Sequence, residues 1–188
     1  MTEKKEKIFF TKKSLARLIA CQALSTYFDE NNKEEDINKI LSNINTYYVM
    51  DEFTNDKNEN SFKTVFKNSF VLQLVNFVLD NTKKLDEIIT KFLNREEPIG
   101  TLDLVVVQIL RTAIAESTLS PELDKKIIIN EYVDIAAEFY ADITPTFVNG
   151  MLDSIFFGKK EKEQKAKKSE HQSNVKIKHK AILTIKKK

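Results

Sequence analysis

Residues that interrupt helices are scarce in this chain, whose 188 residues include only three glycines and three prolines. Between them, apolar residues recur every three or four positions, a spacing that places them on one face of an α-helix. Seven segments follow this pattern: residues 14–28, 35–49, 62–79, 85–93, 101–116, 125–140 and the stretch that begins at residue 144. The sequence therefore predicts an all-α fold of about seven helices.

The arrangement of these helices depends on local details. Apolar residues surround the 62–79 segment on nearly every side, which is typical of a central, buried helix. A polar loop is expected at residues 51–60, and Asp80-Asn81-Thr82 is expected to break the chain into two helices. The run Val105-Val106-Val107 resembles a buried strand, but the body of the chain offers no second such run to pair with it.

Two hydroxyl–proline pairs, Ser120-Pro121 and Thr144-Pro145, are expected to start helices. A hydroxyl at the N-cap accepts a hydrogen bond from a first-turn amide, and a proline at the next position removes an N–H that would lack a partner.

The net charge of +2 conceals a strong segregation of charge. Residues 1–13 contain five lysines and two acidic residues, and residues 159–188 contain twelve lysines and three acidic residues. The residues between them hold 13 basic and 23 acidic side chains. We therefore divide the chain into a basic arm (1–10), a helical domain (11–158) and a flexible lysine-rich tail (159–188). Basic ends suit contact with a polyanion, although a tail that only raises solubility is an equal alternative.

The sequence contains no constellation of residues for catalysis or for holding a cofactor or a metal. Both histidines, His171 and His179, lie in the tail, and neither a cysteine–histidine metal spacing nor a glycine-rich phosphate loop is present. The single cysteine, Cys21, lies among small apolar residues and suits a reducing cytoplasm. No apolar run is long enough to cross a membrane. We therefore expect a cytoplasmic binding protein rather than an enzyme.

Two charged clusters are candidates for binding. Lys13 and Arg17 share a helix face at positions i and i+4, with Lys12 beside them, and this basic start can hold the phosphates of single-stranded RNA. Three acidic residues share a face further on, at spacings of i, i+3 and i+7: Glu131, Asp134 and Glu138. Paired carboxylates can bind a metal or transfer protons, but a solvated face or a surface for a basic protein is the favoured interpretation.

The C-terminal third resembles a known family. Ile129-Asn130-Glu131-Tyr132-Val133 is followed by Phe147-Val148-Asn149-Gly150-Met151-Leu152-Asp153, and the order and separation of these blocks resemble the NusB transcription antitermination family. Further matching segments are Ala16-Arg17, Gln22-Ala23-Leu24, Leu85-Asp86 and Leu110-Arg111-Thr112-Ala113. The resemblance covers about residues 11–157.

The resemblance implies seven helices in two packed bundles and a role without catalysis or cofactor. It implies binding of boxA-type single-stranded RNA in nascent ribosomal RNA transcripts, jointly with ribosomal protein NusE. It also implies that this complex joins the RNA polymerase elongation complex, with which the chain associates indirectly. The RNA contacts expected on this sequence are Lys12, Lys13, Arg17, Gln22 and Phe147, while Glu131, Asp134 and Glu138 form a face for the basic NusE. A core position for Phe147 and a solvated one for Gln22 are the alternatives.

Other positions are assigned structural roles or depart from the family pattern. Gly150 is expected to let two helices approach closely, with Asn149 hydrogen-bonding across or capping that approach, and Arg111 is expected to pair with a buried carboxylate. Leu18 and Ser25 stand where the family has glutamate and tyrosine. Val106-Val107 replaces a charged pair in a region suited to NusE docking.

Two other functions are compatible with these features. The weakened basic start and the acidic body favour a helical protein–protein scaffold, or a homodimer, with reduced RNA binding. The domain also resembles an accessory RNA-binding module of ribosomal RNA methyltransferases, in which a methyl-donor-binding domain follows where this chain has its lysine tail.

Overall fold

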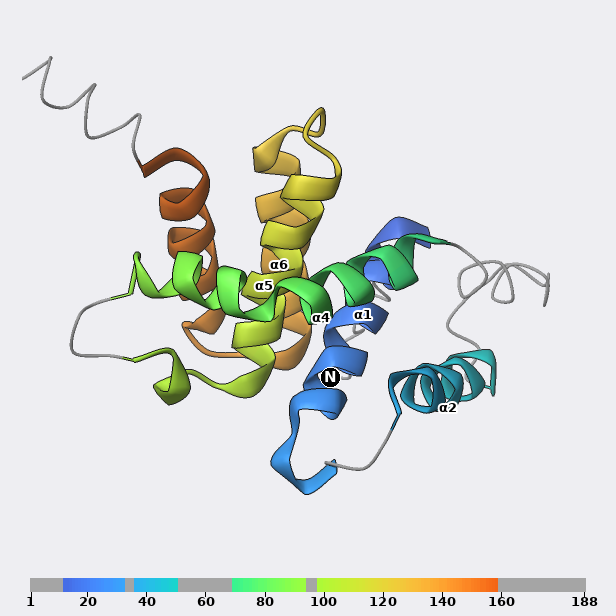
Figure 1. The fold of residues 1–188 in the computed structure, drawn as a ribbon. Coiled ribbons are helices and arrows are strands. Elements are labelled where there is room, and N and C mark those ends of the chain that lie inside the picture. The colour runs from blue at the N-terminus through green and yellow to red at the C-terminus, as the bar shows by residue number, and fades with distance from the viewer. Residues whose placement is uncertain (1–11, 33–35, 51–68, 94–97, 159–188) are drawn as a thin grey trace, which may run out of the picture.

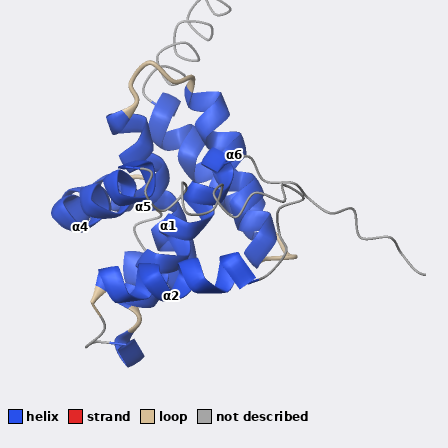
Figure 2. Ribbon diagram, turned by 90° about the vertical axis from the view of Figure 1, so that its right-hand side faces the viewer, coloured by secondary structure: helices blue, strands red, loops and turns tan. Residues whose placement is uncertain are grey.

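Every regular element in the described part of the chain is helical (Figure 1, Figure 2). The computed structural model describes residues 12–32, 36–50, 69–93 and 98–158. Its helices are α1 (Lys12–Phe28), α2 (Ile37–Met50), α4 (Ser69–Thr90), α5 (Leu104–Leu119), α6 (Lys125–Phe139) and a final helix over residues 144–158, with short 3₁₀ turns at Glu30–Asn32 and Ile99–Thr101. The all-α prediction is confirmed. The predicted arm, the polar loop at 51–60 and the tail lie outside the described residues.

The helices α1 and α5 occupy the centre of the molecule. α5 is buried without interruption from Val106 to Glu116, and α1 is buried from Ser14 to Cys21. α4 packs against both of these helices, α6 packs against α5 and α1, and α2 packs against α1. In Figure 1, α2 lies on one side of α1. The helices α5 and α6 and the final helix lie on the other side of α1. Among the described helices, α1 therefore connects α2 to the packed helices α4, α5 and α6.

The structure corrects the expectation that the 62–79 segment forms a central helix buried on all sides. Its described part, the first half of α4, buries Val71 and Leu74, whereas Leu72 is 39% exposed and Asn76 is exposed. The buried positions have the helical period, so this half of α4 is an amphipathic helix on the outside of α1 and α5.

The break expected at Asp80-Asn81-Thr82 is also wrong, because α4 continues through it. The Nδ2 atom of Asn81 donates to the carbonyl oxygen of Phe77 at 2.9 Å. The Oγ1 atom of Thr82 donates to the carbonyl oxygen of Val78 at 2.8 Å. Bonds to carbonyls four residues earlier accommodate these polar side chains within a helix.

Aspartates, rather than the expected hydroxyl–proline pairs, cap four of the described helices, and Asp36 at the start of α2 is one of them. Asp103 and Asp124 accept hydrogen bonds from backbone N–H groups at the starts of α5 and α6. Asp142 accepts one from the backbone of Thr144, which is already the first residue of the final helix. Ser120 is the C-cap of α5 and starts no helix. A carboxylate at a helix start also interacts favourably with the helix dipole, which a neutral hydroxyl does not.

Candidate nucleic-acid interface

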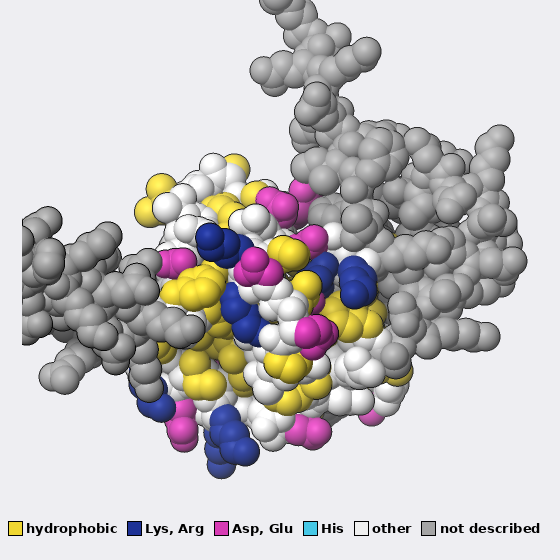
Figure 3. Space-filling view, turned by 90° about the horizontal axis from the view of Figure 1, so that it is seen from above, with side chains coloured by type: hydrophobic (Ala, Val, Ile, Leu, Met, Phe, Trp, Pro, Cys, Tyr) yellow, Lys and Arg dark blue, Asp and Glu magenta, His cyan; other side chains and the backbone are white. Residues whose placement is uncertain are grey.

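The basic start of α1 lies against the first turn of α4. Lys12 is the first residue of α1, and Lys13 is exposed, with its Nζ atom 6.0 Å from the ring centroid of Phe70. Over the described surface seen in Figure 3, basic, acidic and apolar side chains are interspersed. Basic charge is therefore dispersed over that face rather than gathered into one patch.

Arg17, one turn beyond Lys13, is buried and only 3% exposed. Its Nε and Nη2 atoms donate to Oε2 and Oε1 of Glu116, both at 2.7 Å. Its Nη1 atom donates to Oε2 of Glu131 at 2.9 Å, and the hydroxyl of Ser14 donates to that same oxygen at 2.6 Å. Burial by itself lowers the pKa of Arg17, but hydrogen bonding to Glu116 and the charges of Glu116 and Glu131 outweigh it, and the net shift is upward. The guanidinium therefore stays protonated.

This placement changes two assignments made from the sequence. The guanidinium of Arg17 is engaged by carboxylates from α5 and α6, so it is not presented to a phosphate at the surface. Glu131 is half-buried and directed at α1, which leaves Asp134 and Glu138 as the exposed members of the expected acidic face. Arg17 and Glu131 are 114 positions apart in the chain, so helix spacing alone did not reveal their pairing.

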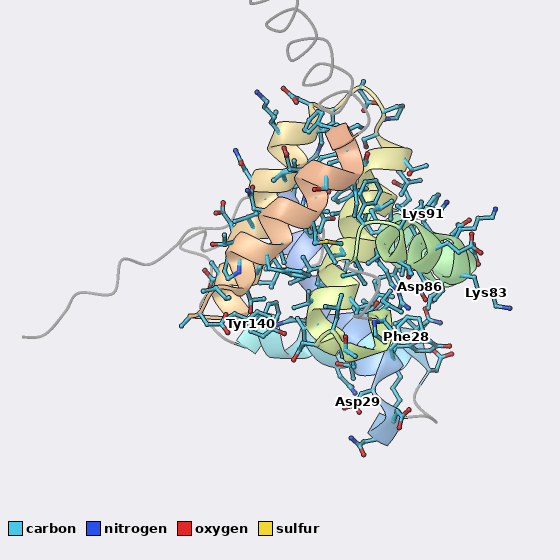
Figure 4. The ribbon with its side chains drawn as sticks, turned by 90° about the vertical axis from the view of Figure 1, so that its left-hand side faces the viewer. Phe28, Asp29, Lys83, Asp86, Lys91 and Tyr140 are labelled. Atoms are coloured by element: carbon cyan, nitrogen blue, oxygen red, sulfur yellow. The ribbon has the colours of Figure 1, made fainter. Side chains whose placement is uncertain are left out.

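A second arginine, Arg111, joins α5 to α4 and α1. Its Nε and Nη2 atoms donate to Oδ1 and Oδ2 of Asp86 at 2.7 and 2.8 Å, and its Cζ atom lies 4.8 Å from the ring centroid of Phe28. Figure 4 shows Asp86 on the side of α4 towards the end of α1, where Phe28 lies, while Lys83 points outward. The predicted structural pairing of Arg111 with a carboxylate is present, but the carboxylate of Asp86 is partly exposed rather than buried.

Gln108 is a buried polar residue that sequence reasoning missed. It is fully buried on α5, and its Oε1 atom accepts a hydrogen bond from Nη1 of Arg111 at 3.3 Å. Its Nε2 atom has no hydrogen-bond partner among the described residues. A glutamine within an apolar helix such as residues 101–116 was the available signal, since buried amides require partners.

The remaining candidate contacts have mixed environments. Gln22 is half-buried on α1, and Phe147 is half-buried and packs against the hydrophobic core. The core alternative fits Phe147 in this placement. Val106 and Val107 are only 4% and 6% exposed, so these two side chains belong to the interior and do not form a docking surface.

Gly150 does not mark a close contact between helices, so that prediction is wrong. It is exposed within the final helix, and its φ is not positive. A Cβ atom added there would meet no atom of another segment within 4 Å. Its neighbour Asn149 is exposed as well, so the pair does not fasten two helices together.

Gly150→Ala is therefore expected to raise the free energy of unfolding by about 0.5–1 kcal/mol, because alanine loses less backbone entropy in a helix. Urea denaturation measures this change. Gly158→Ala is the contrasting variant, because its Cβ would lie 3.2 Å from Cε1 of Phe92 and the gain should be absent. A loss of stability in Gly150→Ala would contradict the open environment of that residue.

The other potentially reactive groups of the described chain are structural. Cys21 is buried, and burial raises the pKa of its thiol to about 12, so it stays protonated at neutral pH.

No group of three or more histidine, cysteine or acidic residues in the described segments could hold a metal ion. None of the helices described above has the length and apolar character needed to span a membrane.

Comparison with known proteins identifies the family of this chain. The model of the NusB family matches residues 14–156. The chain belongs to the NusB family. A NusB-family relative, the transcription antitermination protein NusB of Rickettsia bellii (strain OSU 85-389), is 34% identical over 144 residues, covering 77% of this chain and 89% of that protein.

Solved NusB structures share the fold of this NusB-family chain. T. maritima NusB is 22% identical with a TM-score of 0.57, over 79% of this chain and 92% of that chain. A crystal structure of the antitermination factors NusB and NusE in complex with double-stranded RNA contains a chain that is 21% identical with a TM-score of 0.58, over 78% of this chain and 97% of that one. The basic arm and the lysine tail lie outside the range that matches the NusB family.

Proposed function

We propose that this chain is a transcription antitermination factor that binds boxA-type single-stranded RNA together with NusE and thereby joins the RNA polymerase elongation complex. The observation that carries this proposal is NusB-family membership over residues 14–156. Relatives named as transcription antitermination proteins align over 89% of their own length, so the shared region is nearly the whole of those proteins.

The RNA contacts are assigned to the basic start of α1. Lys12 and Lys13 begin this helix, and the arm before them carries three more lysines. Lysines on a short arm can neutralise phosphates without fixing the sequence that is bound. Arg17 is not among these contacts, because its charge is already balanced by Glu116 and Glu131. Gln22 and Phe147 are retained as candidate contacts with less exposed surface.

The NusE contact is assigned to the exposed acidic residues of α6. Asp134 and Glu138 lie one helical turn apart and are exposed. NusE is expected to be basic, so these carboxylates offer it a complementary surface. Glu131 contributes less to this surface, because its carboxylate bonds to Ser14 and Arg17.

This function involves binding without catalysis, takes place in the cytoplasm and needs no cofactor or metal. The alternative is a scaffold or homodimer with reduced RNA binding. The internal neutralisation of Arg17 favours that alternative, because it removes one cation from the expected RNA surface.

Gel-shift titration with boxA-type RNA, with and without NusE, tests the proposal. The expected result is RNA binding that NusE strengthens. Lys12→Ala/Lys13→Ala should weaken binding and lower the log–log salt slope by about 1.4, at about 0.7 for each lost phosphate contact on a single strand. Asp134→Asn/Glu138→Gln should weaken the NusE effect while RNA binding alone is unchanged. Absence of RNA binding at moderate salt, with NusE binding retained, would favour the scaffold.

A further inference from the structure

Two aromatic rings in the described part of the chain have a cation within about 6 Å of their centroids, a range in which cation–π attraction acts. One is Phe28, against which Arg111 is held by its ion pair with Asp86. The other is Phe70, in the first turn of α4. The Nζ atom of Lys13 lies 6.0 Å from its centroid, and the Cζ atom of Arg17 lies 5.8 Å from it.

The two cations beside Phe70 differ in what they can offer a ligand. Arg17 is buried and paired with Glu116 and Glu131, so its guanidinium serves the interior. Lys13 is exposed. Rotation of its side chain is enough to turn the ammonium group towards an incoming phosphate. Phe70 is half-buried and packs against the core, so the residue is not fully enclosed.

An aromatic side chain beside an exposed lysine is the combination by which proteins hold single-stranded nucleic acid. The base stacks on the ring, and the cation neutralises the backbone.

We propose that Phe70 is an RNA-contacting residue, on which one base stacks while Lys13 contacts the adjoining phosphate. This inference rests on the proposed RNA-binding function and extends its site from α1 to the start of α4. Arg17 faces inward, and Phe70 supplies a contact to RNA beside it. Stacking tolerates any base, so Phe70 contributes affinity more than sequence preference.

Phe70→Leu tests the proposal, because leucine keeps an apolar side chain against the core and removes the aromatic face. The expected result is RNA binding weakened on the order of tenfold, or about 1.4 kcal/mol, because the stacked base loses its aromatic partner. The salt slope should stay unchanged. Lys13→Gln should instead lower that slope by about 0.7. Phe70→Trp should retain binding, because a larger aromatic face is preserved.

Phe77→Leu is the matched control. Phe77 lies two turns further along the same face of α4 and is also half-buried against the core. It should bind RNA as the wild type does, and circular dichroism and thermal unfolding confirm that each variant is folded. Equal losses in Phe70→Leu and Phe77→Leu would overturn the proposal, because they would indicate a packing effect.

Three further outcomes would also overturn it. A folded Phe70→Leu variant with wild-type RNA affinity would remove Phe70 from the site while leaving the proposed function standing. A variant that loses NusE binding but keeps RNA binding would show that the ring contacts protein. No RNA binding by the wild-type chain would overturn the proposed function and this inference together.

Discussion

Arg17→Met is expected to lower the free energy of unfolding by about 3–5 kcal/mol, the range measured when one partner of a buried ion pair is removed. Methionine has a similar length and fills the space between α1, α5 and α6. The loss arises because Glu116, only 1% exposed, keeps its carboxylate in the interior without a cation. Glu131 loses the same partner but is 28% exposed at its side chain and retains the hydrogen bond from Ser14. Urea denaturation followed by circular dichroism measures the change.

A double variant separates the buried charge from the loss of packing. Arg17→Met/Glu116→Leu removes both members of the buried pair and is expected to recover much of the stability, because apolar replacements of buried pairs are often neutral. Lys13→Met, on the same helix but exposed, should change stability by no more than about 0.5 kcal/mol. If Arg17→Met were as mild as Lys13→Met, the buried pair would not exist in solution.

Ile109→Ala is expected to lower the free energy of unfolding by about 2–5 kcal/mol, because it removes buried methyl groups and leaves a cavity. Ile109 is fully buried in the middle of α5, the helix that packs against α1, α4 and α6. The surrounding helices would have to shift together to close the space, so little relaxation is expected. Denaturant unfolding gives the difference directly.

Leu72→Ala provides the comparison for this second prediction. Leu72 lies in the segment that the sequence assigned to the centre of the fold, yet it is 39% exposed. Its replacement should therefore change stability by about 0.5 kcal/mol or less. A cost similar to that of Ile109→Ala would mean that Leu72 is covered in solution.

Most of the fold was accessible from the sequence because helical periodicity is a local property. The boundaries of α6 were predicted to within one residue, whereas the range predicted for α5 begins and ends three residues too early. An all-α architecture followed from the scarcity of glycine and proline. The identity of the central helix was not accessible, because it depends on which faces meet. The 62–79 segment has more apolar residues than α1, but α1 contains the small residues Ala16, Ala20 and Ala23 that allow neighbours to approach.

The candidate site was less accessible because charged side chains acquire their roles from distant partners. Lys13 and Arg17 look alike on a helix face, yet one is exposed and the other is enclosed by Glu116 and Glu131. Gly150 illustrates a different error. Glycine destabilises a helix, so its presence suggested a contact between two helices, but the structure contains no such contact. Phe70 was passed over because its importance comes from Lys13, which lies on another helix.

The central position of α1 has a consequence for how a ligand would be held. Because α1 is buried from Ser14 to Cys21, its amides beyond the first turn are expected to exchange only when the domain opens. The basic start of α1 is therefore continuous with a segment that is expected to exchange slowly. The helix is already ordered before a ligand binds. The conformational entropy lost on association is therefore mainly that of the ligand and of long side chains such as Lys13.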